Sequence, residues 1–215
     1  MKKESIKAFI EYGVNRELTA KQLRNMAFGL SIFYGIGILY GFMMGGTELI
    51  LGKAILIITI FFTIYILFKS RTKKLTLKNF CVLAGVTSLE ATINFLLITL
   101  IICQMLGVKM WINVVVLLVP LFIMTVYFII TYNRIRNGAF LNKGEMKKKN
   151  LYLFSSLGGV AGISIARTYL STVGQSTALL ILVIGFLALS TIFSFANINF
   201  LKLYYIEKVF KNDIY

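Results

Sequence analysis

Three polar residues have the spacing of one helix face within an otherwise apolar stretch of the chain. Thr87, Glu90 and Asn94 stand at positions i, i+3 and i+7 in the stretch 80 to 106. Side chains at these spacings lie on the same side of a helix. If this stretch crosses a membrane, Glu90 lies near the middle of the bilayer, where an ionisable group is costly and marks a functional site. These three residues are therefore the candidate interior polar site.

Arg167 carries a second charge within a predicted membrane stretch, residues 151 to 172. At a helical rise of 1.5 Å per residue, Glu90 lies about 15 Å and Arg167 about 24 Å from the inner ends of their helices, so direct contact requires tilt. We expect both side chains to face the bundle interior and form its charged centre, directly or through water or a ligand. In the alternative, Arg167 extends to the outer surface, while Glu90 is protonated or bonded to Asn94.

Catalytic chemistry is poorly represented in the chain. It has no histidine, and its sole aspartate is Asp213. This composition excludes His-dependent metal sites, Ser-His and Cys-His dyads, and transferases built on clustered aspartates. A mechanism with two carboxylates would need Glu48, which lies toward the opposite surface from Glu90. The chain also contains no glycine-rich phosphate loop. We therefore expect no catalytic residue, no metal and no cofactor, and a protein that is not an enzyme.

Composition identifies lipid as the solvent for most of the chain. Of its 215 residues, 58% are hydrophobic and 14% are charged, and the mean hydropathy is +0.83. A soluble domain is only about half apolar. Crossing a bilayer core of about 30 Å takes about 20 apolar residues. We predict an all-α, polytopic transmembrane bundle of six helices, at residues 26 to 45, 49 to 68, 80 to 106, 111 to 131, 151 to 172 and 177 to 201.

Basic residues predict the orientation of these helices. Twenty of the 23 lie before the first helix, after the last, or in the second and fourth connections, whereas Lys53 and Lys109 lie on the other side. The crowded side is cytoplasmic by the positive-inside rule. We therefore predict a multi-pass protein of the cell membrane with both termini in the cytoplasm, divided into an N-terminal arm (1–24), a transmembrane domain (25–201) and a basic tail (202–215).

The same distribution of charge bears on organisation and partners. External connections are short and internal ones are long and basic, which predicts that the six helices form three hairpins. The net charge of +15 requires no nucleic acid, because topology and attraction to anionic lipids at the cytoplasmic face account for it. A basic surface for a cytoplasmic partner is the alternative.

The N-terminal arm has an amphipathic pattern. Apolar residues recur at helical spacing, with charged residues on the rest of the helical wheel; the apolar residues are Ile6, Phe9, Ile10, Val14 and Leu18. This pattern predicts an interfacial helix on the inner leaflet. The alternative is a helix that binds a partner.

Small residues at four-residue spacing predict two close helix contacts. Such residues let helix backbones approach where lipid supplies no hydrophobic drive for association. They are Gly37, Gly41 and Gly45 in the first helix, and Gly158, Gly162 and Ala166 in the fifth. Either series can face another helix of the chain or a second protomer.

Pro120 is the only proline, and it lies in the middle of the fourth predicted helix. A proline inside a helix removes one backbone hydrogen bond, here the one to the carbonyl of Val116, and bends the helix. Pro120 is therefore a candidate hinge, with a static bend as the alternative.

Two non-enzymatic functions remain. The first is a small transport component, either a permease half or a membrane-embedded substrate-binding subunit, working with other membrane proteins, a second copy of itself or a separate ATPase. The second is an immunity, sensor or assembly-accessory protein that binds a membrane-active peptide or another membrane protein. The six helices, small-residue faces and interior polar stripe favour transport; the amphipathic arm and the scarcity of interior polar groups favour the second function. The Lys-rich and Ile-rich composition is compatible with a bacterial source.

Overall fold

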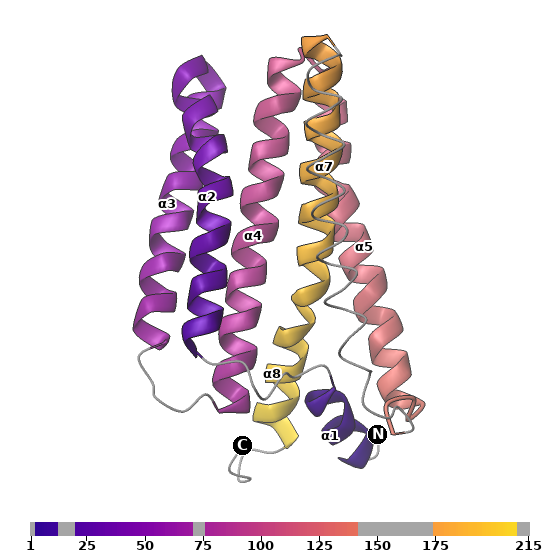
Figure 1. Ribbon diagram of the computed structural model, residues 1–215. Helices are drawn as coiled ribbons and strands as arrows, with labels where there is room; N and C mark the ends of the chain where they lie inside the picture. Colours follow the sequence, from indigo (N-terminus) through magenta and orange to yellow (C-terminus); the bar gives the residue numbers. More distant parts are fainter. Residues whose placement is uncertain (1–2, 13–19, 71–75, 142–173, 210–215) are drawn as a thin grey trace.

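A computed structural model describes residues 3–12, 20–70, 76–141 and 174–209, and within them the chain forms helices and no strands. The longer helices run side by side along most of the length of the molecule, and two short ones lie at one end (Figure 1). They are α1 (Lys3–Glu11), α2 (Ala20–Met44), α3 (Gly46–Lys69), α4 (Leu77–Met105), α5 (Met110–Arg136), α7 (Gln175–Ala196) and α8 (Ile198–Val209).

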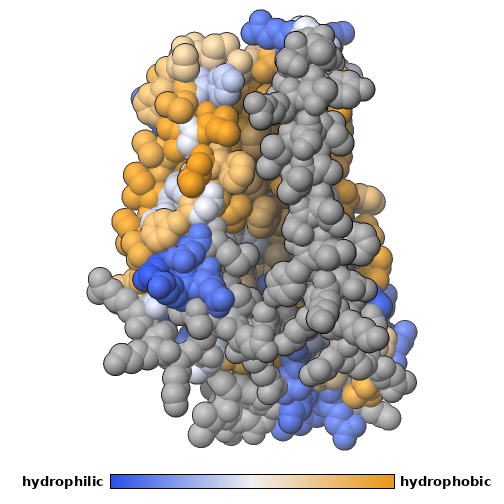
Figure 2. Space-filling model, viewed as in Figure 1, coloured by the Kyte–Doolittle hydropathy of each residue, from blue (hydrophilic) through white to orange (hydrophobic). Residues whose placement is uncertain are grey.

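Five helical segments are long and apolar enough to cross a membrane: α2 from Ala27, α3, α4, α5, and α7 together with α8. They correspond to five of the six predicted spans, so the described residues confirm an all-helical chain with several candidate membrane spans. The predicted span 151–172 lies outside the described residues. In Figure 2 the coloured residues between the two ends of the molecule are mostly hydrophobic, and hydrophilic residues gather at the top and in the lower part.

α4 is the central helix of the bundle. It packs against α2, α3, α5, α7 and α8, and Figure 1 shows it between the α2 and α3 pair and α7. Of the residues in its candidate span, 67% are buried inside the protein, whereas the share is only 17% to 22% in the other four candidate spans. The outer helices therefore direct most of their side chains away from the protein, as expected where lipid is the solvent.

Helix ends differ from the predicted ones where polar residues continue a helix. α2 begins at Ala20 rather than at residue 26, because its first turns contain good helix formers such as Lys21 and Gln22. α8 continues to Val209, into the segment predicted to be a tail. There, Tyr205 and Ile206 are buried, so tertiary packing stabilises the added turns.

Turn residues explain the connections that the structure describes. Thr76 caps α4, with its side chain accepting a hydrogen bond of 3.2 Å from the Asn79 amide. Gly45 and Gly46 have positive φ angles of 75° and 57° and allow α3 to follow α2 almost immediately. α2 and α3 thus form a helical hairpin. α5, by contrast, packs more extensively on α7 than on α4, so an arrangement of three hairpins is not confirmed.

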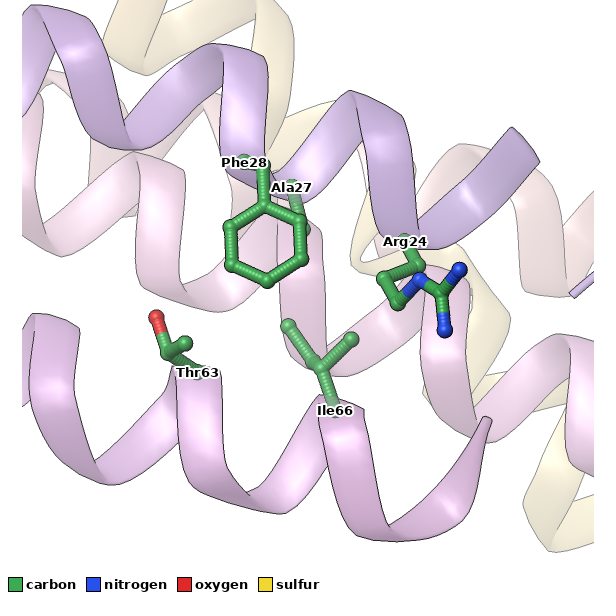
Figure 3. A pocket seen from close by; sticks show the side chains of 5 residues that line it. All are labelled: Arg24, Ala27, Phe28, Thr63 and Ile66. Atoms are coloured by element: carbon green, nitrogen blue, oxygen red, sulfur yellow. The ribbon is translucent and has the colours of Figure 1, made fainter. Parts of the chain in front are cut away.

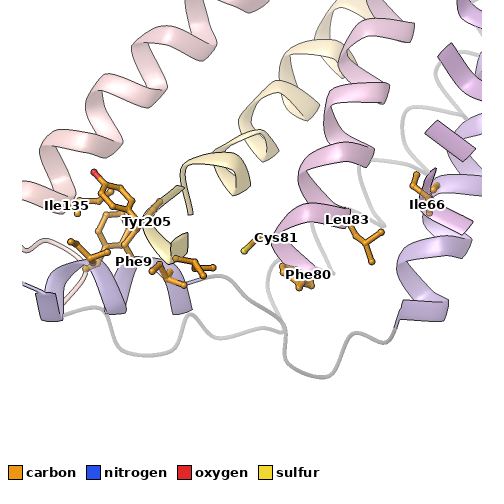
Figure 4. Packing of buried hydrophobic residues seen from close by; sticks show 12 residues of the cluster. Phe9, Ile66, Phe80, Cys81, Leu83, Ile135 and Tyr205 are labelled. Atoms are coloured by element: carbon orange, nitrogen blue, oxygen red, sulfur yellow. The ribbon is translucent and has the colours of Figure 1, made fainter. Parts of the chain in front are cut away.

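α1 packs against the bundle through its apolar face. Ile6, Phe9 and Ile10 are only 4%, 2% and 3% exposed. They join a cluster with buried residues of α4, α5 and α8, in which the Phe9 ring meets the Tyr205 ring edge-on at 6.2 Å; Figure 4 shows this packing. The interfacial helix is not confirmed, because the described part of this face contacts protein. Val14 and Leu18 lie outside the described residues.

Candidate functional site

The polar stripe of α4 lies at the centre of the bundle. Glu90 is 1% exposed and Asn94 is 0% exposed. Glu90 stands 13 residues after Leu77 and 15 before Met105, the two ends of α4, or about 20 Å from either end at the helical rise. A carboxyl group at this depth is far from bulk water on every side.

Two residues from neighbouring helices complete this site. The Asn94 Nδ2 donates a hydrogen bond of 3.2 Å to Thr59 Oγ1 on α3. Tyr34 of α2 is completely buried and meets the ring of Phe95, the residue that follows Asn94 in α4, edge-on at 5.6 Å. We call Tyr34, Thr59, Glu90 and Asn94 the Glu90 site; Thr87 continues its stripe on α4.

Oxygen atoms of this site lack hydrogen-bond partners. Five buried side-chain oxygens have none in the described part of the chain. Four of them lie on this stripe or beside it, namely Tyr34 Oη, Thr87 Oγ1, Glu90 Oε1 and Asn94 Oδ1, and the fifth is Asn113 Oδ1 of α5. Leaving a buried polar group unsatisfied costs about 1–3 kcal/mol. Four such groups on one helix face and its neighbour therefore point to a partner outside the described residues, namely a ligand, a proton, water or a side chain such as that of Arg167.

The opposite side of α4 has a polar seam with α7 and its junction with α8. Ser88 Oγ donates to Asn197 Oδ1 at 2.8 Å, and Ser190 Oγ donates to the Thr92 carbonyl at 3.0 Å. These groups satisfy one another within the protein. We therefore interpret the seam as structural. The Glu90 site is the functional candidate, because its buried oxygens lack such partners among the described residues.

Arg167 lies outside the described residues, so its predicted relation to Glu90 stays a prediction. No lysine or arginine of the described segments forms an ion pair with Glu90. One ion pair among the described residues joins Lys78 to Glu207 at 2.9 Å, at the exposed end of the bundle where α4 begins and α8 ends.

The first glycine series divides between two roles. A Cβ on Gly41 would lie 2.7 Å from the Cα of Gly52, so α2 and α3 are in close contact there. A Cβ on Gly37 would collide with Ile98 of α4. Gly45 meets nothing within 4 Å and has a positive φ, so it serves the turn rather than helix packing. Gly158, Gly162 and Ala166 lie outside the described residues.

Pro120 is buried inside α5, together with Val116. α5 remains a single helix from Met110 to Arg136. A proline in the interior of a helix that packs on α7 is compatible with either a hinge or a static bend, so the predicted hinge stays a prediction.

A shallow groove lies between α2 and α3, away from the unsatisfied oxygens. Its lining residues are Arg24, Ala27, Phe28, Thr63 and Ile66 (Figure 3). The empty volume is about 150 Å³, which includes space open to the outside. Sites for small organic ligands enclose about 300–1,000 Å³, so this groove does not qualify as one.

Sequence reasoning found Glu90, Asn94 and Thr87 but missed Tyr34 and Thr59. Tyrosine and threonine are compatible with a lipid-exposed helix, so their residue types gave no signal. The sequence did place both residues near the middle of their predicted spans, at about the depth of Glu90, and this was the signal that could have identified them. Comparisons with protein families, characterised proteins and solved structures find no match to this chain.

Proposed function

We propose that this chain is a non-enzymatic, membrane-embedded transport component, either a permease half or a substrate-binding subunit. The observation that carries the proposal is the burial of Glu90 beside unsatisfied oxygens in the middle of an apolar bundle. Ionisable residues at such depth are expensive, and in membrane proteins they line pathways for ions or substrates. A chain with no transport role would gain stability from an apolar residue at this position.

The proposal includes a location and an orientation. The protein lies in the cell membrane with both termini in the cytoplasm and six spans that follow one another as three hairpins. Support comes from α1, the end of α5 and the end of α8, which gather at one end of the bundle (Figure 1). Most basic residues belong to that end by sequence, and they attract anionic lipids. α1 then lies at the inner surface, with its exposed Lys7 toward the lipid headgroups.

A separate ATPase is the expected energy source, because the chain carries no nucleotide-binding motif. The test is to purify the tagged chain from its own membranes in mild detergent and to identify proteins present in equimolar amounts. The complex is then reconstituted into liposomes. We expect an ATPase in the complex, and an ATPase activity that falls at least tenfold when Glu90→Gln replaces the natural chain.

An immunity, sensor or accessory protein is the alternative. It is favoured by the apolar surface of α3, where Ile57, Phe61 and Phe68 are exposed and a membrane-active peptide or another membrane protein could bind. A toxin or pore-forming peptide in the purified complex, in place of an ATPase, would overturn the transport proposal. Unchanged ATPase activity with Glu90→Gln would also contradict it, because the proposal depends on that residue.

A further inference from the structure

We infer that the Glu90 site binds a monovalent alkali cation. This inference names the ligand of the site and rests on the proposed function only in taking that cation to be a transported or coupling ion. Three helices supply the oxygens: Tyr34 from α2, Thr59 from α3, and Glu90 with Asn94 from α4.

Buried oxygens of the site have unused capacity to bind a ligand. Glu90 Oε1, Asn94 Oδ1 and Tyr34 Oη are buried and lack hydrogen-bond partners in the described part of the chain. The Asn94 amide nitrogen already donates to Thr59 Oγ1, which orients the Asn94 carbonyl oxygen away from Thr59. The carbonyl is thereby left available as an acceptor or ligand. Hard cations prefer such carboxylate, carbonyl and hydroxyl oxygens.

Charge selects a monovalent ion. Glu90 contributes one negative charge, and the other three residues of the site are neutral. A monovalent cation makes the site neutral, which removes most of the cost of a charge at the bundle centre. A divalent ion would leave a net positive charge there. No group of three His, Cys, Asp or Glu side chains comes together in the described segments, so the ligands expected for a transition metal are not assembled here.

The helix arrangement gives the ion a structural effect. α2 and α3 form a hairpin, and both contact α4. Because the ligands belong to all three helices, a bound ion joins the hairpin to the central helix. Binding to the folded state then raises the unfolding temperature as cation concentration increases.

The test is thermal unfolding of the purified full chain in detergent, in chloride salts of sodium, potassium, lithium and choline at constant ionic strength. We expect a saturable rise of about 5 °C for at least one alkali cation over choline. Radiolabelled sodium, displaced by each unlabelled salt, gives a direct measurement of binding. Equal unfolding temperatures in all four salts, together with no saturable binding, would overturn the inference.

Two variants locate the effect. Glu90→Gln removes the charge, and Tyr34→Phe removes one oxygen while keeping the ring that packs on Phe95. We expect complete loss of the cation effect with Glu90→Gln and at least a tenfold weaker affinity with Tyr34→Phe. The matched control is Tyr127→Phe, since the Tyr127 ring contacts Phe195 between α5 and α7, away from the site.

Each outcome bears on the inference separately from transport. A cation effect that survives in both Glu90→Gln and Tyr34→Phe would place the ion elsewhere and overturn the inference. If Glu90→Gln does not fold, the comparison of Tyr34→Phe with Tyr127→Phe decides the matter. Because these measurements use the isolated chain, a cation-binding protein that copurifies with no ATPase would contradict only the transport proposal.

Discussion

Gly41 of α2 and Gly52 of α3 bring two helix backbones into direct contact. A Cβ on Gly41 would lie 2.7 Å from the Cα of Gly52, and a Cβ on Gly52 would lie 3.0 Å from the Cα of Gly41. Real Cβ atoms are essentially never found at the first of these distances, and the second is tighter than most real Cβ contacts. In lipid, such contact stabilises a helix pair through van der Waals packing, and this pair carries two residues of the Glu90 site.

Gly41→Leu should therefore separate α2 from α3 and destabilise the protein. We expect a loss of about 1–3 kcal/mol, the usual cost of overpacking a closely packed position. Thermal unfolding in detergent measures the effect. The control is Gly35→Leu in the same helix, where nothing lies within 4 Å of the new Cβ. Similar losses at both positions would mean that the contact at Gly41 contributes nothing special.

Lys202 of α8 contacts the end of α1 and the segment that follows it. It is 5% exposed, its Nζ donates a hydrogen bond to the Tyr12 carbonyl, and the Nζ lies 5.7 Å from the centre of the Phe9 ring. Lys202→Met keeps the apolar stem and removes the charge and the donor. We expect a cost of about 1.5–3 kcal/mol, typical of a hydrogen bond to a charged group, and faster hydrogen exchange of the α1 amides.

The control for Lys202→Met is Lys208→Met in the same helix. Lys208 is exposed and donates to Tyr204 Oη at 2.8 Å, so its replacement should change stability by less than about 0.5 kcal/mol. If the α1 amides exchange equally fast in both variants, the contacts of Lys202 do not hold α1 in place.

The spans and the polar stripe were predictable because both depend on local pattern. α3, α4 and α5 begin within three residues of the predicted starts, since long apolar stretches bounded by charges leave little choice. Glu90 and Asn94 were predictable because helical spacing places them on one face.

Contacts between helices were not predictable from spacing alone. The four-residue glycine pattern does not distinguish Gly41, which packs on α3, from Gly45, which forms the turn. An amphipathic pattern is the same whether its apolar face meets lipid or protein, so the packing of α1 on α5 and α8 required the tertiary structure. Tyr34 and Thr59 belong to the Glu90 site only because their helices meet α4.

Ser88 and Asn197 join α4 to the break between α7 and α8. Their hydrogen bond of 2.8 Å is buried, and Asn197 is the C-cap residue of α7. A double-mutant cycle with Ser88→Ala and Asn197→Ala should give a coupling energy of about 0.6 kcal/mol, the average for bonds between membrane helices, and at most about 1.7 kcal/mol. Thermal unfolding provides the four stabilities. Strictly additive losses would show that the bond makes no net contribution.

The orientation of the bundle can be tested on α5, whose two ends lie at opposite ends of the molecule (Figure 1). Lys109 is exposed just before α5, and its side chain makes no capping hydrogen bond to the helix. Arg136 is exposed in the last turn of α5. The native thiols Cys81 and Cys103 are 0% and 2% exposed, so they give little background with a membrane-impermeant thiol reagent. We expect the reagent to label Lys109→Cys in intact cells, and Arg136→Cys only after the membrane is permeabilised, because the side with most of the basic residues is cytoplasmic by the positive-inside rule. Labelling of Arg136→Cys alone in intact cells would show that the orientation is the opposite of the proposed one. Labelling of both in intact cells would show that α5 does not cross the membrane.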